Sequence, residues 1–402
     1  MLRKTPHYIL KITSISFGFI SAFVLLEIIS RILPASKNFP LKLPLNCKTL
    51  ITSFSDVDQD CLFQRNPNFQ GIFTRGIFPP FPVYAFKKAN DIGQFSDVDF
   101  HEVSELNPKI FPIISIGDSY AEALQVPNYQ TYHGLLNQYI TQNGKIVKSS
   151  AIASGGNPLS QYVISAMFAR KYLKNPNSTF IFSIISNDFD ESILGENAFQ
   201  TGGIFKINKD DYGKTLYINR DSSLGIKTRR FIFKNSAFAR FLMINVRITN
   251  FAYKYPFCLF TDFSCNEIKN IKANIVDSSK SNDNRRFNIS YKATDTFLFE
   301  ISKLRPTDSE RKKTIFVIDA DRFPIYDKTL KESEYFRAQR NYFIKRAKTY
   351  GFTVIDMKPI FSDHYLKNKQ RFEFSNDKHW NSLGHKVVSQ EIIKNLELQP
   401  KS

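Results

Sequence analysis

The sequence predicts an α/β protein with a mostly parallel sheet that is covered by helices on both faces. Two observations support this prediction, and a third adds an element to it. After residue 105, apolar β-branched runs alternate with stretches of helical periodicity, as in parallel strands joined by helical crossovers. The chain has 402 residues with 42% hydrophobic content, which is enough to bury a large core. One long apolar stretch near the N-terminus adds a membrane-crossing helix.

The apolar stretch at residues 12–33 is long enough to cross a bilayer, which requires about 20 residues. Basic residues precede it, as in a signal sequence, and no clear cleavage site follows. Glu27 and Arg31 are spaced to pair on one helix face and to reach the headgroups. We therefore expect residues 1–11 to be a short cytoplasmic N-terminus and 12–33 to be an uncleaved signal anchor, the alternative being a buried core helix.

The four cysteines follow this stretch in two close pairs, and the disulfide candidates are Cys47, Cys61, Cys258 and Cys265. Local disulfides of this kind form in an oxidising compartment, whereas unpaired buried thiols are the alternative. We therefore expect a single-pass membrane protein with its catalytic domain outside the cytoplasm, in the periplasm or on the cell surface. The six histidines lie far from the cysteines in sequence, so we expect no metal site and no organic cofactor.

A formal net charge of +18 suggests an anionic partner, such as nucleic acid, anionic lipid or an acidic polymer. The basic residues are spread along the chain, and neither zinc-finger spacing nor an aromatic RNA-binding signature is present. The sequence therefore predicts no nucleic-acid partner.

Residues 34–105 are rich in Pro, Asn and Asp and are expected to form a stalk or entry segment, followed by a catalytic domain at 106–398. Buried strands are predicted at 110–116, 145–152, 179–185, 314–318 and 352–355. Helices are predicted at 131–143, 159–173, 334–350 and 382–396. Between the third and fourth strands lies an insertion at about 189–293, which we expect to be a lid, a partner surface or a partly disordered segment.

In open α/β sheets the active site forms beyond the carboxyl ends of the strands. Directly after the first strand comes Gly117-Asp118-Ser119, where glycine permits a sharp turn and Ser119 would begin a helix. The N–H groups at such a helix start stabilise an oxyanion next to a serine nucleophile. An ordinary helix-capping turn has the same letters.

Two further strand ends carry possible oxyanion donors. Gly155 and Gly156 follow the second strand, where a backbone without Cβ atoms can approach a substrate closely, although a plain loop turn would have the same sequence. Asn187 follows the third strand, and its side-chain amide could donate to an oxyanion or could cap the next helix.

Near the C-terminus, Asp377 and His379 precede a helix. A serine becomes a good nucleophile when a neutral imidazole takes its proton, and a carboxylate fixes the tautomer of that imidazole. Asp377 and His379 could supply these groups, with Asn376 as a rival partner for His379, whereas a solvated turn is the alternative. Trp380 could stack on a sugar ring or pack in the core. Arg322, after the fourth strand, could bind a substrate anion, brace the site or lie in a solvated turn.

The order Gly-Asp-Ser, Gly, Asn and Asp-x-His along the chain resembles the SGNH (GDSL-type) hydrolases and acyltransferases, over roughly residues 110–395 without the insertion. The run from Asp377 to His385 is similar to the last block of envelope SGNH proteins associated with polysaccharide acylation. The family usually has a glycine where this chain has Ile185 and a longer Asp-His spacing. The resemblance implies a flavodoxin-like three-layer α/β/α fold.

The same resemblance implies a catalytic set of Ser119, His379 and Asp377, with Ser119, Gly155 and Asn187 forming the oxyanion hole. The expected function is that of an esterase or O-acyltransferase acting on an acylated cell-surface or exported polysaccharide. A membrane acyl-donor protein or a polysaccharide-assembly protein would be its partner. The alternatives are a lipid or lysophospholipid esterase, and a catalytically silent membrane-tethered polysaccharide-binding protein.

Overall fold

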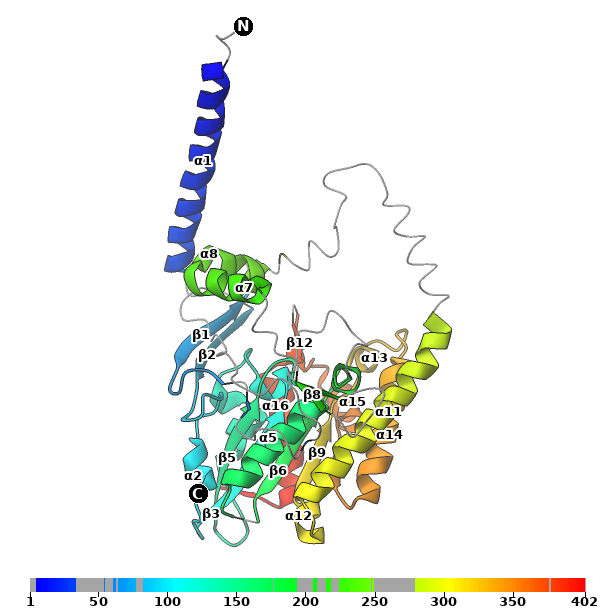
Figure 1. Ribbon diagram of the computed structural model, residues 1–402. Helices are drawn as coiled ribbons and strands as arrows, with labels where there is room; N and C mark the ends of the chain where they lie inside the picture. Colours follow the sequence, from blue (N-terminus) through cyan, green and yellow to red (C-terminus); the bar gives the residue numbers. More distant parts are fainter. Residues whose placement is uncertain are drawn as a thin grey trace.

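The fold is taken from a computed structural model of the chain. It describes residues 5–33, 54, 61–62, 64–76, 82–175, 177–193, 205–207, 215–217, 224–246, 248, 279–375 and 377–401. Helix α1 (Thr5–Ile32) projects away from the sheet, with its C-terminal end toward the rest of the fold (Figure 1). Within the described residues it is the one helix long and apolar enough to cross a membrane, over Lys11–Ile32, and Arg31 pairs with Glu27 as predicted, at 2.9 Å.

A seven-stranded sheet lies at the centre of the fold, in the order β10-β9-β6-β3-β5-β4-β13. Its parallel strands are β3 (Ile110–Gly117), β5 (Ile146–Ala153), β6 (Thr179–Ile184), β9 (Thr314–Ile318) and β10 (Thr353–Asp356). Numbered along the chain, these five strands lie in the order 2-1-3-4-5, which is the flavodoxin-like order. The predicted α/β fold with a mostly parallel sheet is therefore confirmed, and its topological switch point lies between β3 and β6.

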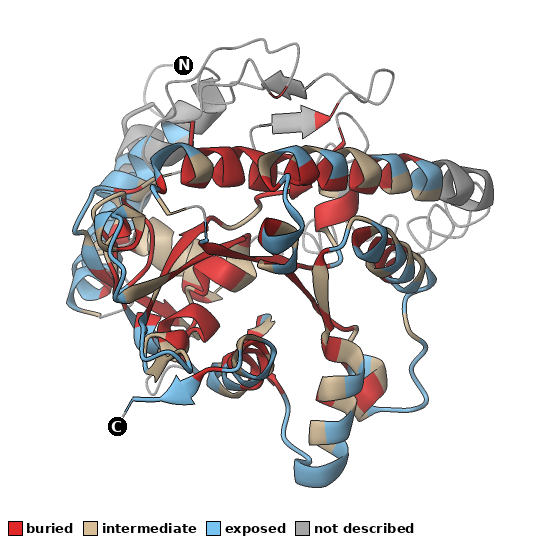
Figure 2. Cartoon of the chain, turned by 90° about the horizontal axis from the view of Figure 1, so that it is seen from below, coloured by how far each residue is buried: buried red, intermediate tan, exposed pale blue. Residues whose placement is uncertain are grey.

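Alternate strand residues point to opposite sides of the sheet, and apolar residues lie on both sides. Helices therefore cover both faces. Phe182 lies in the core under α5 (Leu159–Tyr172), α11 (Ser279–Leu304) and α14 (Glu334–Thr349). Ile181 lies in the other core, under α4 (Tyr132–Leu136), α15 (Met357–Asn368) and α16 (Ser382–Leu396). Figure 2 shows the buried residues concentrated on the sheet and on the helix surfaces that face it.

Two parts of the fold differ from the sequence expectations. The predicted helix at 131–143 ends early, because β4 (Tyr139–Ile140) pairs with β5 and with β13 (Gln399–Pro400) at the sheet edge. Helix α11 begins inside the predicted insertion, and its residues Ala293 and Phe297 are fully buried. It forms the helical crossover between β6 and β9, although its first turns are polar in sequence.

Outside the sheet, β1 (Gln70–Arg75) and β2 (Val83–Lys88) form an antiparallel hairpin. A helical segment at the foot of α1 comprises α7 (Leu224–Asn235), α8 (Ala237–Arg240) and the π-helix η5 (Phe241–Val246). The remaining helices are α2 (Phe100–Ser104), α3 (Ser119–Glu122), η3 (Asn128–Gln130), α6 (Asp188–Glu191), α12 (Asp308–Lys312) and α13 (Phe323–Tyr326). The remaining strands are β7 (Phe205–Ile207), β8 (Thr215–Tyr217), β11 (Glu373–Phe374) and β12 (Asp377–Trp380).

Candidate active site

Ser119 lies at the first position of α3, directly after β3 and next to the switch point of the sheet. Gly117 is required before it, because an added Cβ would lie 2.3 Å from Ser183 Oγ. Asp118 caps α3 by accepting from Tyr120 N–H at 2.9 Å, and Ser119 Oγ donates to Asp118 Oδ2 at 3.0 Å. Burial raises the pKa of the Asp118 carboxyl to about 6, although these hydrogen bonds and His379 oppose the shift.

Asp377 and His379 form a close hydrogen-bonded pair at the other end of the chain. His379 Nδ1 lies 2.5 Å from Asp377 Oδ1, and His379 N–H donates to the same oxygen at 3.1 Å. Burial alone would raise the pKa of Asp377, but His379 and Arg75 hold it well below its usual range. The carboxylate therefore stays ionised beside the imidazole, and Nε2 of the ring is left for proton transfer.

Tyr120 joins these two segments. Its ring centroid lies 4.9 Å from that of His379, and its hydroxyl donates to the Lys378 carbonyl at 2.9 Å. Because Tyr120 follows Ser119 directly, the fold brings the predicted nucleophile into the neighbourhood of the predicted base. The Ser119 hydroxyl itself donates to Asp118 in this structure, so this hydrogen bond must be given up before the proton passes to His379.

The two glycines after β5 lie where predicted, but the N–H of Gly155 already has an acceptor. It donates to Glu122 Oε2 at 2.8 Å, and the Glu122 carboxylate also contacts the buried guanidinium of Arg65. Burial lowers the pKa of Arg65 to about 9. A Cβ at Gly155 would lie 3.4 Å from Ser119 Cβ, so this glycine permits close approach to the serine. The Gly155 N–H is therefore not directed at an oxyanion in this structure, unlike the prediction. Gly156 has a φ of +81°, in the left-handed region that favours glycine.

Asn187 lines a cavity of about 500 Å³ beyond the carboxyl ends of β6 and β9. The turn that carries it is fixed by Asp188, whose Oδ2 accepts from Ile185 N–H at 2.8 Å and from the Tyr162 hydroxyl at 3.0 Å. The cavity is also lined by Tyr120. It therefore extends from the residue next to Ser119 to the predicted oxyanion donor Asn187.

Of the interpretations that the sequence allowed for Arg322 and Trp380, the structure contradicts the substrate-binding ones and the solvated turn at Arg322, and it supports bracing by Arg322 and packing of Trp380. The Arg322 side chain is only 6% exposed, and it forms ion pairs with Asp319 at 2.5 Å and Glu373 at 3.1 Å. Trp380 is fully buried, and its Nε1 donates to Asp319 Oδ1 at 3.1 Å. Arg322 has no free donor pair for a substrate anion, and no face of Trp380 is open to a sugar ring. Both residues instead brace the strand that carries His379.

Arg75 and Gln125 are site residues that the sequence did not reveal. Arg75 Nε forms an ion pair with Asp377 Oδ2 at 2.7 Å, and Gln125 Nε2 donates to the same oxygen at 3.1 Å. Arg75 belongs to the hairpin, which lies in the segment predicted as a stalk. From the same hairpin, Lys87 Nζ donates to the carbonyls of Ala123 and Val126, at 3.0 and 3.1 Å, and so holds the loop that carries Gln125.

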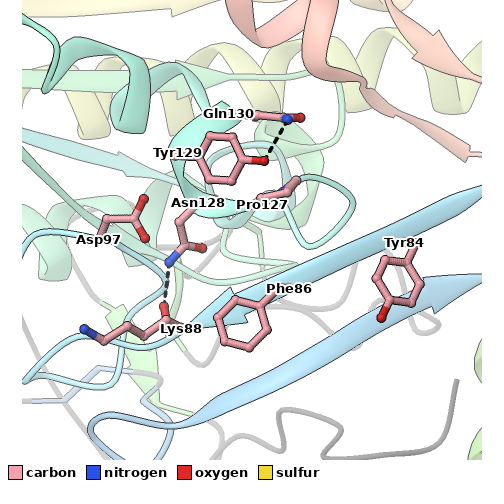
Figure 3. Close-up of a pocket in the computed structure, with 8 residues that line it drawn as sticks. All are labelled: Tyr84, Phe86, Lys88, Asp97, Pro127, Asn128, Tyr129 and Gln130. Atoms are coloured by element: carbon pink, nitrogen blue, oxygen red, sulfur yellow. Dashed lines mark hydrogen bonds between the residues drawn. The ribbon is translucent and has the colours of Figure 1, made fainter. Parts of the chain in front are cut away.

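A second cavity, of about 410 Å³, lies between β2 and the loop after Gln125 (Figure 3). Tyr84, Phe86 and Tyr129 line it and are 53, 49 and 58% exposed. Asp97 and Asn128 add polar groups, and Asn128 donates to the Lys88 carbonyl at 2.7 Å. The cavity thus combines exposed aromatic rings with hydrogen-bonding side chains.

Cys61 is disulfide-bonded. The other three disulfide candidates, Cys47, Cys258 and Cys265, lie outside the described residues. Asn376, the rival partner for His379, also lies outside them. In the described part of the chain, no cluster of three or more His, Cys, Asp or Glu side chains is arranged to hold a metal ion.

Several solved structures are similar to the chain in outline. An α/β hydrolase, LAE5, from the metagenome of Lake Arreo is 13% identical, with a TM-score of 0.38, and the match covers 73% of this chain and 98% of that one. A member of the lipolytic G-D-S-L family from Veillonella parvula is 10% identical, with a TM-score of 0.36 and coverage of 71% and 97%. The acetyl xylan esterase AlAXEase is 12% identical, with a TM-score of 0.36 and coverage of 70% and 98%.

No family model and no curated protein matches the sequence. At these identities and TM-scores, the case for a function depends on the residues of the site itself.

Proposed function

We propose that the chain is an SGNH-type enzyme that performs serine-dependent ester chemistry, with Ser119 as nucleophile, His379 as base and Asp377 as the orienting carboxylate. The observation that carries the proposal is the Asp377–His379 pair, with its 2.5 Å contact, next to the turn that presents Ser119. A carboxylate that stays ionised and contacts Nδ1 holds the ring in the tautomer whose Nε2 accepts a proton. A solvated turn has no need of a buried carboxylate with three further donors.

In the proposed first step, His379 Nε2 takes the proton of the Ser119 hydroxyl while Oγ attacks the carbonyl carbon of an ester. The carbonyl oxygen becomes an oxyanion, which the Asn187 amide and the Ser119 N–H would stabilise. Gly155 N–H would join them only after leaving Glu122. His379 then gives its proton to the leaving alcohol, and the acyl group remains on Ser119.

Water as second reactant would make the protein an esterase, whereas a sugar hydroxyl would make it an O-acyltransferase. We propose an acylated cell-surface or exported polysaccharide as the substrate class. The second cavity supports this proposal, because Tyr84, Phe86 and Tyr129 offer aromatic faces beside polar groups. Residues 125–130 connect this cavity to the segment that carries Asp377 and His379. Gln125 donates to Asp377, and Gln130 accepts from Ser382 Oγ at 2.5 Å.

We further propose that α1 anchors the protein in a membrane, with the enzyme on the extracytoplasmic side. The length and apolar composition of α1 support the anchor, and the disulfide at Cys61 supports an oxidising compartment. A membrane protein that supplies acyl groups or assembles the polysaccharide would be the partner.

The test is release of p-nitrophenol from p-nitrophenyl acetate by the wild-type chain and by Ser119→Ala, His379→Ala and Asp377→Asn. We expect loss of turnover in the first two variants and a decrease of roughly 10⁴-fold in the third, as for loss of the orienting carboxylate in serine hydrolases. Equal rates for all four proteins would contradict the mechanism and would favour the silent polysaccharide-binding alternative.

Hydrolysis of lipid esters is the second candidate function. It is favoured by the contact between the hairpin that carries Arg75 and the helical segment at the foot of α1, in which Asn245 donates to Thr74 Oγ1 at 3.0 Å. Comparing acetyl release from a polymeric acetylated glycan with acyl release from lysophosphatidylcholine separates the two candidates.

A further inference from the structure

The C-terminal end of α1 carries a docked helical segment. The Glu27 carboxylate accepts from Ser236 Oγ at 2.8 Å and from the N–H groups of Ala237 and Phe238 at 2.9 and 3.0 Å. Arg31 Nε donates to it at 2.9 Å. Glu27 of the anchor therefore caps the first turn of α8, and four donors compensate a carboxylate that an apolar helix would otherwise leave uncompensated.

Two further contacts fix the position of this segment along the axis of α1. Arg31 Nη2 donates to the carbonyl of Asn235, the last residue of α7, at 3.0 Å. The rings of Phe23 and Phe238 pack edge to face, with centroids 6.0 Å apart. In Figure 1, α7 and α8 lie across the foot of α1 rather than continuing along it. Helix α7 therefore lies at the level where a membrane-spanning α1 leaves the hydrocarbon core and enters the headgroups.

The surface of α7 matches that location. Phe231 and Ile232 are 69 and 43% exposed, so neither side chain is packed into the catalytic region. The sequence of α7 also includes four basic residues, Lys227, Arg229, Arg230 and Lys234. Large apolar side chains together with basic residues are typical of helices that lie in the interface of a membrane with anionic lipids.

The same segment extends to the site. Asn245 of η5 donates through Nδ2 to Thr74 Oγ1 and to the Gly76 carbonyl, both at 3.0 Å. Thr74 and Gly76 flank Arg75, whose ion pair with Asp377 measures 2.7 Å. A continuous set of contacts therefore connects the anchor to the carboxylate that orients His379.

We propose that residues 224–246 form an interfacial platform that lies on an anionic bilayer surface and holds the catalytic centre at the level of the lipid headgroups. This inference rests on the proposed membrane anchor and on the proposed role of Asp377. The anchor is then a structural part of the enzyme, and the ester reaches Ser119 at the membrane surface.

The test uses the full-length chain in vesicles of phosphatidylcholine and phosphatidylglycerol, with and without brominated phosphatidylcholine, which quenches tryptophan fluorescence on contact. Trp380 is the only tryptophan in the sequence and is fully buried, so it gives a constant background. The probe is Phe231→Trp. The matched control is Leu366→Trp, a 60% exposed apolar position on α15, and Phe19→Trp, at a 74% exposed position of α1, reports the anchor.

We expect loss of fluorescence in brominated vesicles for Phe231→Trp and Phe19→Trp, and no loss for Leu366→Trp. If Phe231→Trp behaves like Leu366→Trp while Phe19→Trp is quenched, the platform is overturned and the anchor stands. If Phe19→Trp is not quenched either, both the platform and the anchor are overturned. The ester chemistry is judged separately, from turnover of the soluble ester.

Discussion

Replacing Asp118 with asparagine is expected to stabilise the protein at neutral pH and to stabilise it much less in acid. Asp118 is fully buried, and burial is the main reason why its pKa rises from the ordinary value of 3.8 to about 6. Asparagine keeps an oxygen that accepts from Tyr120 N–H, which is the capping hydrogen bond of α3. The substitution therefore removes a buried negative charge and largely preserves the turn.

The magnitude follows from the pKa shift. The native state holds the Asp118 proton more tightly than the unfolded state, so stability falls as the pH rises from about 3.8 to about 6 and is constant above that. A shift of this size corresponds to about 3 kcal/mol at pH 7.5 and about 1 kcal/mol at pH 4.5. Loss of the hydrogen bond from Ser119 Oγ offsets about 1 kcal/mol of the gain at both pH values.

The assay is urea unfolding of the wild-type chain and of Asp118→Asn at pH 4.5 and pH 7.5. The gain in free energy of unfolding should be about 2 kcal/mol larger at pH 7.5. Asp363→Asn, at an exposed position on α15, is the control and should show little difference between the two pH values. An effect of Asp118→Asn that does not change with pH would refute the assignment of the raised pKa to burial.

Three further predictions concern the surroundings of the site. Arg322→Met should lower the free energy of unfolding by about 3–5 kcal/mol, because it leaves two buried carboxylates without their cation. If urea unfolding shows a decrease below about 1 kcal/mol, the structural role is contradicted and substrate binding by Arg322 is again the better interpretation. Arg75→Gln should move the acidic limb of the kcat/KM profile to higher pH, because a nearby cation no longer opposes protonation of Asp377, whereas Arg75→Lys should largely restore it. An unshifted profile with reduced activity would indicate a purely structural arginine. Phe86→Ala should raise KM for an acetylated polysaccharide and leave p-nitrophenyl acetate hydrolysis unchanged; equal effects on both substrates would exclude the second cavity as a glycan site.

The sheet could be predicted from the sequence because its central strands are buried on both faces. Such strands read as continuous apolar runs, and the runs at 110–116 and 314–318 correspond to β3 and β9. Helix α11 was not predicted, because its first turns are polar and give no periodic signal before Ile289. The length of α4 was overestimated because pairing at the sheet edge, which depends on β13, overrides local helical periodicity.

The same reasoning explains which site residues could be found. Ser119 and Asn187 closely follow strands, where the α/β fold places functional groups. Asp377 and His379 could be paired from the sequence because they are only two residues apart. Arg75 and Gln125 lie far from Asp377 in sequence and carry no local pattern, so only the folded chain reveals their contacts with it. The sequence favoured a solvated turn at Arg322 because a polar loop sequence does not report a buried ion-pair network. Packing of Trp380 was among the expectations, but its hydrogen bond to Asp319 was not.

The central claim is that Ser119 is a nucleophile activated by His379. Its most direct test is treatment of the folded chain with an active-serine fluorophosphonate probe, followed by mass spectrometry of the adduct. We expect a single major adduct on Ser119 that is absent in Ser119→Ala and strongly reduced in His379→Ala. A folded, disulfide-intact chain that is not labelled, or that is labelled equally well without His379, would contradict it.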